Sequence, residues 1–319
     1  MIPEYVRQQA KIELARRSIW EYSKLRYPNF FKEDREYLKT ICKEIQEFTE
    51  QEEYKFLLLN VPPRHGKSFT VKNTVEWLFG HDNKLKIITG SYNEILSGIF
   101  ATQVRNTIQE EKTDNKIIYS DIFPNTKIKY GEASAKLWAL EGQEEKSYLA
   151  TSPTGTSTGL GGKYVIIDDV IKNDMEAYNE LVLEKHWSWL TNTILSRLEG
   201  NDWKVIVVMT RWSENDLAGR LLQSEYKDLV KQITFPVVQE DGSMLCDEIM
   251  NRETYELKIK EMNPDIAEAN YNQKLIDMKN RLYNDFKVWE ELPKYNKKCN
   301  YTDTADTGED YYCSINYVE

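Results

Sequence analysis

The fold is decided by the stretch Phe56-Leu57-Leu58-Leu59-Asn60-Val61-Pro62-Pro63-Arg64-His65-Gly66-Lys67-Ser68. Its first four residues form a short apolar run that is typical of a buried strand. A helical pattern begins near Phe69, directly after Gly66-Lys67-Ser68. Gly-Lys-Ser between a strand and a helix is the context of a phosphate-binding loop, because the first N–H groups of the helix can hold a phosphate. The stretch therefore predicts a site for the phosphates of a nucleotide.

The residue types in this loop indicate a division of roles on ATP. Lys67 would neutralise the β and γ phosphates, and the Ser68 hydroxyl would bind Mg²⁺. Arg64 is either a solvated loop residue or a cation directed at the γ-phosphate. Val61 stands where the common pattern has its first glycine, so the motif is a variant, and a simple turn at a helix start is the alternative. We expect contacts to the nucleotide from Pro62, Pro63, Arg64, His65, Gly66, Lys67, Ser68 and Phe69.

Three further short apolar runs follow, and helical stretches separate them. Each run is rich in branched residues, as buried parallel strands are. Because strands and helices alternate, we expect an α/β fold in which helices flank a mostly parallel sheet. The runs are residues 86–90, 164–167 and 205–209, the expected helices are 95–108 and 175–197, and the glycine-rich stretch 151–163 is expected to be a loop.

Weaker patterns lie on either side of this region. Residues 1–53 carry apolar residues at helical spacing, and Tyr27-Pro28-Asn29 breaks the expected helices. After Leu222 we expect a strand and a helix, then a polar linker, and finally one hairpin. In order, these are residues 235–238, 252–278, 294–299, and 299–306 with 313–318.

Composition limits the classes of function. The 319 residues are 40% hydrophobic and 29% charged, with a formal charge of −10. No apolar run approaches the ~18 residues of a membrane span, and the N-terminus has no signal pattern, so we expect a cytosolic protein without a membrane partner. The acidity argues against a surface that grips nucleic acid throughout, because Lys and Arg supply that affinity. The four cysteines form no Cys-x-x-Cys pair, which argues against a zinc ribbon.

A second candidate site follows the apolar run at 164–167. Asp168 and Asp169 end this strand about a hundred residues after Lys67, and at the carboxyl end of a parallel strand they face the same crevice as the phosphate loop. Asp168 would hold Mg²⁺ through water, and Asp169 would orient or deprotonate the attacking water. Asp169 is one carbon shorter than the Glu of many such ATPases, so Glu176 on the next helix is an alternative for this role.

The run at 205–209 ends in a hydroxyl and a cation, Thr210 and Arg211, instead of acids. A polar residue at this strand tip can contact the γ-phosphate and report hydrolysis to a neighbouring element. Ordinary capping of a strand end is the alternative for Thr210, because Thr is common in strands.

Taken in order, these motifs resemble the motif series of tailed-bacteriophage terminase large subunits, over roughly residues 20–319. The resemblance implies a P-loop NTPase core of the RecA-like, additional-strand (ASCE) type with a small lid subdomain, followed by an RNase H-like nuclease. The matching segments are Pro62-Pro63-Arg64-His65-Gly66-Lys67-Ser68, Ser91-Tyr92-Asn93, Gly155-Thr156-Ser157-Thr158-Gly159, Ile167-Asp168-Asp169-Val170-Ile171-Lys172-Asn173, and Met209-Thr210-Arg211-Trp212 followed by Asp216-Leu217-Ala218-Gly219-Arg220-Leu221.

The resemblance also implies a division of the chain and roles for three more residues. Thr210 falls in the motif that couples hydrolysis to movement. Arg105 is a candidate for an arginine that acts on the ATP of a neighbouring subunit, with an exposed helix charge as the alternative. Asp303 matches the first metal-binding acid of the nuclease, and because two-metal nucleases need several carboxylates, we expect no DNA cleavage by this chain. The expected parts are a helical segment at 1–53, an ATPase core at 54–222, a lid and linker at 223–293, and the first hairpin of a truncated nuclease domain at 294–319.

A motor that packages DNA is the function implied by the resemblance, encoded by a virus or prophage and acting in the host cytoplasm. The implied partners are double-stranded DNA, the portal protein and procapsid, the terminase small subunit, and further copies of the chain in a ring on the portal, with a monomer expected in isolation. A helicase-like ATPase and an inactive remnant are the alternatives, although intact Lys67, Ser68 and Asp168 argue against the remnant. Aromatic candidates for contact with adenine are Tyr27, Phe30 and Phe31.

Overall fold

The computed structural model describes residues 3–114, 116–132, 134–155, 159–275, 296–303 and 313–318. The chain forms two compact units, Met1–Ile276 and Asp277–Glu319. The first unit holds the loop that contains Gly66, Lys67 and Ser68.

A seven-stranded sheet forms the centre of the first unit, in the order β3-β4-β2-β5-β6-β1-β7. Six strands run parallel, and β3 pairs antiparallel with β4 at one edge. The predicted α/β fold with a mostly parallel sheet is therefore confirmed. The strands are β1 (Phe56–Asn60), β2 (Ile87–Gly90), β3 (Leu137–Trp138), β4 (Tyr148–Thr151), β5 (Tyr164–Asp168), β6 (Lys204–Met209) and β7 (Val230–Thr234).

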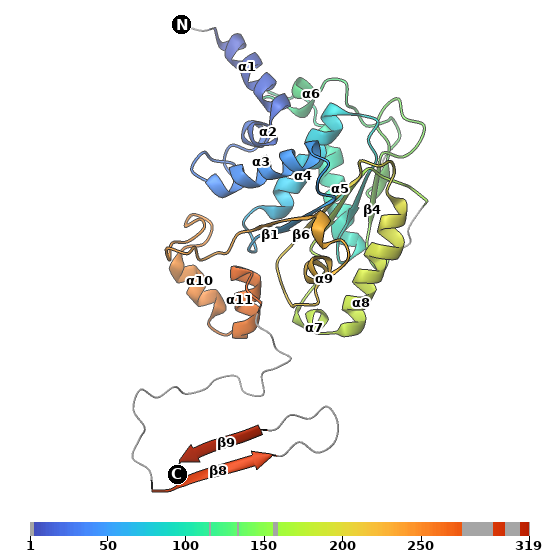
Figure 1. Ribbon diagram of the computed structural model, residues 1–319. Coiled ribbons are helices and arrows are strands. Elements are labelled where there is room, and N and C mark those ends of the chain that lie inside the picture. Colours follow the sequence, from blue (N-terminus) through green and yellow to red (C-terminus); the bar gives the residue numbers. More distant parts are fainter. Residues whose placement is uncertain are drawn as a thin grey trace. The chain divides into compact units, whose positions relative to one another are not determined.

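Helices cover both faces of this sheet (Figure 1). On one face lie α2 (Ile19–Arg26), α3 (Glu36–Glu50), α4 (Lys67–His81), α5 (Glu94–Ile108) and α6 (Tyr119–Ile122), and α1 (Glu4–Arg17) packs against α2, α4 and α6. The other face packs against α7 (Asp174–Ala177), α8 (Glu180–Ser188), the π-helix η1 (Trp189–Ile194), the 3-10 helix η2 (Leu195–Arg197) and α9 (Leu217–Gln223). A short 3-10 helix, η3 (Lys227–Leu229), precedes β7.

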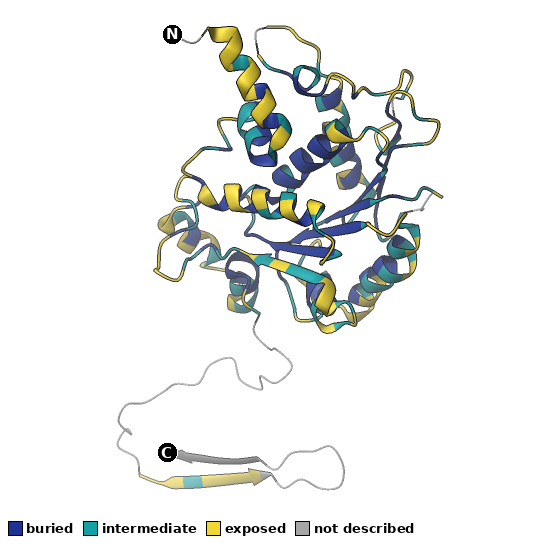
Figure 2. Cartoon of the chain, turned by 45° about the horizontal axis from the view of Figure 1, so that its top comes forward, coloured by how far each residue is buried: buried dark blue, intermediate teal, exposed yellow. Residues whose placement is uncertain are grey.

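The apolar runs are continuous because both faces of the central strands are covered. In β1, Phe56 and Leu58 belong to the core under α8 and α9, whereas Leu57 and Leu59 belong to the core under α3 and α4. Alternate side chains of a strand point to opposite faces, so each layer receives every second residue. Figure 2 shows the result: the central strands are buried along their length, and the outer face of α3 is exposed.

A smaller cluster packs α10 (Arg252–Ile259) and α11 (Pro264–Asn272) against the chain that follows β7. Its core contains Val237, Met250, Tyr255 and Tyr271. This cluster matters for the site, because α11 brings polar side chains to the end of β6.

The prediction of a strand at residues 235–238 is wrong. The chain instead forms β7 at Val230–Thr234, which pairs with β1. β7 is the edge strand of the sheet and is only partly buried. Because it contains the polar residues Lys231 and Gln232, it has no continuous apolar run from which a strand could be predicted. The division of the chain into parts stays a prediction, but β7 lies in the segment expected to form the lid and belongs to the main sheet.

Two predicted helices are each interrupted. The helix expected at 175–197 starts afresh at Asn179, whose side chain accepts hydrogen bonds from the Leu181 and Val182 N–H groups. The helix expected at 252–278 is broken before Pro264, where Asn263 caps α11. By contrast, the break expected at Tyr27-Pro28-Asn29 does separate α2 from α3.

The second unit contains an antiparallel pair of strands, β8 (Lys298–Asp303) and β9 (Cys313–Val318). The predicted hairpin is therefore confirmed, while its assignment to an RNase H-like domain stays a prediction. Within the described ranges, no helix has the length and apolar character needed to span a membrane.

Candidate active site

The loop between β1 and α4 is shaped to receive an anion. Gly66 has φ of 86°, a left-handed conformation, and a Cβ at this position would lie 2.5 Å from the Phe30 ring. Only glycine fits here without strain. Because glycine carries no capping side chain, the first N–H groups of α4 keep their capacity to bind an anion.

Two residues of the loop support it from behind. His65 is fully buried, its Nδ1 lies 2.9 Å from the Pro63 carbonyl oxygen, and its own carbonyl accepts a hydrogen bond from the Tyr37 hydroxyl at 3.2 Å. Pro62 is also buried. Of the residues expected to contact the nucleotide, His65 and Pro62 thus lie beneath the loop, and the other six line a cavity above it.

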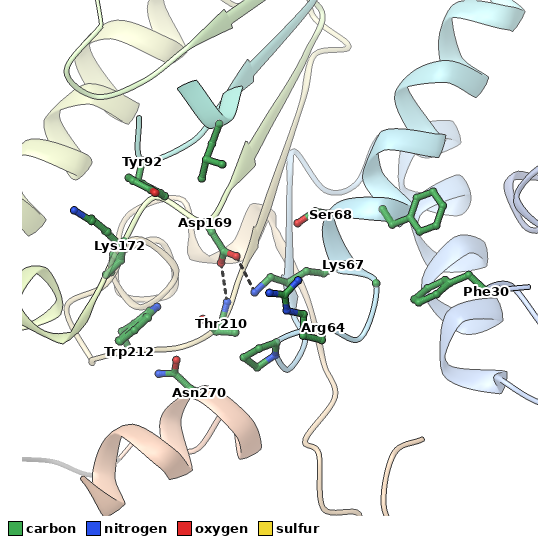
Figure 3. A pocket seen from close by; sticks show the side chains of 15 residues that line it. Phe30, Arg64, Lys67, Ser68, Tyr92, Asp169, Lys172, Thr210, Trp212 and Asn270 are labelled. Carbon is green, nitrogen blue, oxygen red and sulfur yellow. Dashed lines mark hydrogen bonds and ion pairs between the residues drawn. The ribbon is translucent and has the colours of Figure 1, made fainter. Parts of the chain in front are cut away.

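The phosphate loop meets the end of β5 through two direct contacts. The Lys67 ammonium lies 2.9 Å from Asp169 Oδ2, and the Ser68 hydroxyl donates to Asp168 Oδ1 at 2.9 Å. Asp169 Oδ1 in turn accepts a hydrogen bond from the Thr210 N–H at 3.3 Å (Figure 3). Because β1, β5 and β6 are parallel neighbours, their carboxyl ends bring these residues to one edge of the sheet.

The two aspartates differ in their surroundings. Burial first, and the neighbouring Asp169 carboxylate second, raise the pKa of Asp168 to about 7, against the opposing effects of Lys67 and Ser68. Asp169 has φ of 44° and a side chain that is 36% exposed. A positive charge placed beside Ser68 and Asp168 would favour the ionised form of Asp168.

A cavity of about 540 Å³ opens above these contacts, within the size range of small-molecule sites. Side chains from the loop, α4, α5, the segment after β5, the end of β6 and α11 surround it (Figure 3). Its lining consists of Phe30, Pro63, Arg64, Gly66, Lys67, Ser68, Phe69, Tyr92, Leu96, Asp169, Ile171, Lys172, Thr210, Trp212 and Asn270.

Some candidates from the sequence lie elsewhere. Glu176 is in α7, where its carboxylate accepts the Lys172 N–H at 2.9 Å, and it does not line the cavity. Arg105 is in the last turn of α5 and donates to the Ser134 carbonyl at 2.6 Å. Asp303 ends β8, and its side chain lies outside the described residues. Residues 156–158 of the glycine-rich motif also lie outside them.

The aromatic candidates for an adenine contact are separated by the fold. Phe30 lines the cavity and packs against Phe69, with ring centroids 5.3 Å apart. Tyr27 lines a neighbouring cavity of about 520 Å³ between α4 and α5, whereas Phe31 is buried, with 1% of its surface exposed. Of the three, Phe30 therefore lines the cavity above Lys67, and Tyr27 lines the neighbouring cavity, which shares Ser68 and Phe69 with it.

Six lining residues have no individual role predicted from the sequence: Tyr92, Leu96, Ile171, Lys172, Trp212 and Asn270. Lys172 stands inside the segment 167–173 and Leu96 lies three residues after Ser91-Tyr92-Asn93, and their position a few residues beyond a strand end is the signal that could have found them. Tyr92, Ile171 and Trp212 also stand inside the matching segments, and Trp212 is the second residue after Thr210. Asn270 comes from α11, and no local pattern predicts that this helix reaches the site.

Neither a protein-family model nor a curated protein sequence matches the chain. Solved structures do match it. The HK97 bacteriophage large terminase aligns with a TM-score of 0.51 and 11% identity, covering 74% of this chain and 49% of that protein. The ATPase domain of the Thermus phage P74-26 large terminase, solved as a mutant, aligns with a TM-score of 0.50 and 11% identity, covering 75% of this chain and 93% of that domain.

The chain has the fold of a phage large-terminase ATPase domain. At 11% identity the likeness concerns the terminase-like fold, and it spans about half the length of the HK97 protein. Among the described residues, no group of three or more His, Cys, Asp or Glu side chains is arranged to hold a metal ion.

Proposed function

We propose that the chain is an ATPase that binds ATP with Mg²⁺ at the cavity above Lys67 and hydrolyses the terminal phosphate. The observation that carries the proposal is the double contact between two distant segments: Lys67 with Asp169 and Ser68 with Asp168, each 2.9 Å. A phosphate loop and a carboxylate strand end that touch in this way can share one triphosphate.

The loop supplies the binding of the phosphates in this proposal. The N-terminus of α4 offers backbone N–H groups and the positive end of the helix dipole. Lys67 adds a buried ammonium, and Arg64 adds an exposed guanidinium on the wall of the cavity. These positive groups oppose the charge that builds up on the phosphate oxygens during transfer.

The donor atoms beside the loop fit Mg²⁺. A serine hydroxyl and a carboxylate oxygen are ligands of the kind that this ion prefers. Burial and the neighbouring Asp169 carboxylate raise the pKa of Asp168, and a bound cation would offset both effects. Ser68 and Asp168 would hold the ion, Asp168 through water. When bound, Mg²⁺ would neutralise part of the phosphate charge.

Asp169 is the better placed of the two candidates for activating water. Its carboxylate lines the cavity, and the Thr210 N–H fixes one of its oxygens. In the reaction, the water oxygen bonds to the γ-phosphorus, the bond to the β–γ bridging oxygen breaks, and the water proton passes to Asp169 Oδ2. Glu176 lies in α7 with its carboxylate already engaged by the Lys172 N–H.

DNA packaging is the proposed use of this hydrolysis. The support comes from the ordered motifs and from the terminase-like fold, since the two solved structures reported above are described as a large terminase and a large-terminase ATPase domain. Double-stranded DNA, a portal and procapsid, a terminase small subunit and a ring of like subunits are the proposed partners, in the cytoplasm of an infected host. With a net charge of −10, contact with DNA would be confined to a small part of each subunit.

The test measures phosphate release from ATP with Mg²⁺, with and without double-stranded DNA. Lys67→Ala should abolish release, whereas Lys43→Ala, which removes a lysine from the exposed face of α3, should leave it unchanged. An unchanged rate in Lys67→Ala would exclude this loop as the site. If double-stranded DNA does not stimulate hydrolysis and is not moved while ATP is hydrolysed, the packaging part of the proposal fails.

A further inference from the structure

The backbone of Arg211 is held by two side chains from α11. The Arg211 N–H donates to Gln273 Oε1 at 3.0 Å, and its carbonyl accepts from Asn270 Nδ2 at 3.1 Å. Gln273 follows the last residue of α11, has φ of 58°, and donates from Nε2 to the Asn270 carbonyl at 2.7 Å. The two side-chain amides are therefore fixed relative to each other, and together they bind the backbone N–H and the backbone carbonyl of Arg211.

These contacts replace pairing that the sheet no longer offers. The last residue of β6, Met209, pairs with Asn60 of β1, and Val208 pairs with Asp168 of β5. The chain beyond Met209 thus extends past both neighbouring strands. Buried backbone groups need partners, and α11 provides them with side-chain amides instead of a strand.

The side chain of Arg211 is fixed as firmly as its backbone. Its Nε lies 3.0 Å from Asp216 Oδ2, and Asp216 also accepts from the N–H groups of Trp212, Ser213 and Gly219. Asp216 is fully buried and caps α9. The segment that follows β6 is consequently held on one side by α9 and on the other by α11.

Thr210 connects this held segment to the reacting groups. Its N–H donates to Asp169 Oδ1, and the other carboxylate oxygen of Asp169 contacts Lys67. This N–H belongs to the Met209–Thr210 peptide, and the Arg211 N–H belongs to the next peptide, so a shift of the Arg211 backbone would reach the Thr210 N–H through the Thr210 Cα. The contacts on Arg211 thus decide where that carboxylate points.

We propose that Asn270 and Gln273 are positioning residues, which act on Asp169 through the backbone of Thr210 and Arg211. The proposal rests on the proposed function and adds to it a dependence of turnover on α11. Asn270 lines the cavity, but its Nδ2 is engaged by the Arg211 carbonyl, and neither amide belongs to the phosphate loop. Their loss therefore lowers the rate of hydrolysis much more than it weakens the binding of ATP. A displacement of this kind costs about 10-fold to 100-fold in rate.

Asn272 offers a matched control in the same helix. It is 8% exposed where Asn270 is 6% exposed, and its side chain contacts Tyr255, Glu268 and the Val238 N–H, all away from β6. Asn270→Ala and Asn272→Ala both remove buried hydrogen bonds and should lower the melting temperature. Only Asn270→Ala should lower kcat per folded molecule while the Kd for ATP stays within about threefold.

A second pair of variants tests the acceptor on Gln273. Gln273→Glu keeps an oxygen for the Arg211 N–H, whereas Gln273→Met keeps the length of the side chain and removes that oxygen. Gln273→Glu should therefore retain more turnover than Gln273→Met. The inference is overturned if Asn270→Ala and Asn272→Ala lose activity only in proportion to their loss of folded protein, or if the Kd for ATP rises as much as kcat falls.

Hydrogen exchange separates this inference from the proposed function. Without any nucleotide, Asn270→Ala should speed exchange of the Thr210 and Arg211 amides, and Asn272→Ala should not. Equal exchange in both variants would refute the positioning role. If the exchange differs as expected but the unmodified chain hydrolyses no ATP, then the contact between α11 and the end of β6 stands and the proposed function fails.

Discussion

The Lys67 ammonium lies 2.9 Å from Asp169, the carboxylate that follows the Mg²⁺ candidate Asp168 in the chain. The lysine side chain is 8% exposed and the aspartate side chain 36% exposed. The Asp169 carboxylate therefore neutralises the buried charge of Lys67 and still lines the cavity. A triphosphate that drew Lys67 onto its own oxygens would release Asp169 Oδ2 for the attacking water.

The first prediction separates Asp169 from Glu176. Asp169→Asn keeps the size of the side chain and removes its capacity to take a proton, so ATP should still bind while hydrolysis falls by about 10²-fold or more. Glu176→Gln should change the rate by less than about threefold, because Glu176 does not line the cavity. Single-turnover hydrolysis together with binding of a non-hydrolysable analogue measures both. Persistent turnover in Asp169→Asn would end the assignment of this residue as the base.

The second prediction concerns the cation. Ser68→Ala removes the hydroxyl that donates to Asp168, and it should raise the Mg²⁺ concentration needed for half-maximal hydrolysis by about tenfold or more. Ser68→Thr keeps a hydroxyl and is the matched control. Excess EDTA should stop hydrolysis in the unmodified chain. A Mg²⁺ dependence that is the same in all three proteins would show that Ser68 does not hold the ion.

The central strands could be predicted from the sequence because burial on both faces leaves a continuous apolar run. This holds for β1, β2, β5 and β6. It fails for β7, whose edge position leaves it partly exposed. It also fails for the two-residue β3, which is too short to carry a pattern, and for β4, a short buried strand that was not predicted and whose Thr151 was assigned to the glycine-rich loop.

The site, too, could be predicted only in part. The meeting of Lys67 with Asp169 follows from parallel topology, since strand ends in one sheet share an edge. The approach of Asn270 depends on how α11 packs on the rest of the chain, which no periodicity encodes. The depth of His65 was also unpredicted, because a loop residue beside Gly66 gives no sign of facing inward.

The third prediction concerns the two arginines. Arg64 lines the cavity, whereas Arg105 donates to the Ser134 carbonyl. For dilute protein, Arg64→Ala should lower kcat by about 10²-fold, because it removes a charge near the phosphates. Arg105→Ala should leave the rate of dilute protein unchanged and lower only a rate that rises with protein concentration. A loss in Arg105→Ala at every concentration, with none in Arg64→Ala, would reverse these roles.

The fourth prediction concerns the ring of Phe30, which lines the cavity and lies close to Gly66. Phe30→Ala should raise the Kd for ATP by about 5-fold to 20-fold, since aromatic stacking contributes about 1–2 kcal/mol. Binding of inorganic triphosphate, which has no base, should change much less. Phe31→Leu is the control, because Phe31 is buried and does not line the cavity. Equal losses for ATP and triphosphate would mean that Phe30 only shapes the loop.

The fifth prediction uses the buried His65 beneath the phosphate loop. Burial lowers the pKa of His65 below its ordinary value of 6.5, the hydrogen bond with the Pro63 carbonyl opposes this, and the charges of Arg35, Lys258 and Lys67 lower it further. The unfolded chain therefore takes up the proton at a higher pH than the folded chain. Neutral His65 therefore contributes its full share to the free energy of unfolding above about pH 6.5. This contribution should fall as the pH drops from about 6.5 to the lowered pKa, by at most about 1.4 kcal/mol per pH unit.

His65→Asn isolates this contribution, because its amide can still donate to the Pro63 carbonyl but does not titrate. The free energy of unfolding of both proteins should be measured by denaturant titration between pH 8 and pH 5. The unmodified chain should lose more stability than the variant below pH 6.5, and the two should run parallel above it. Parallel curves over the whole range would show that His65 is not held neutral under the loop, and that its burial does not support Gly66 in the way the structure indicates.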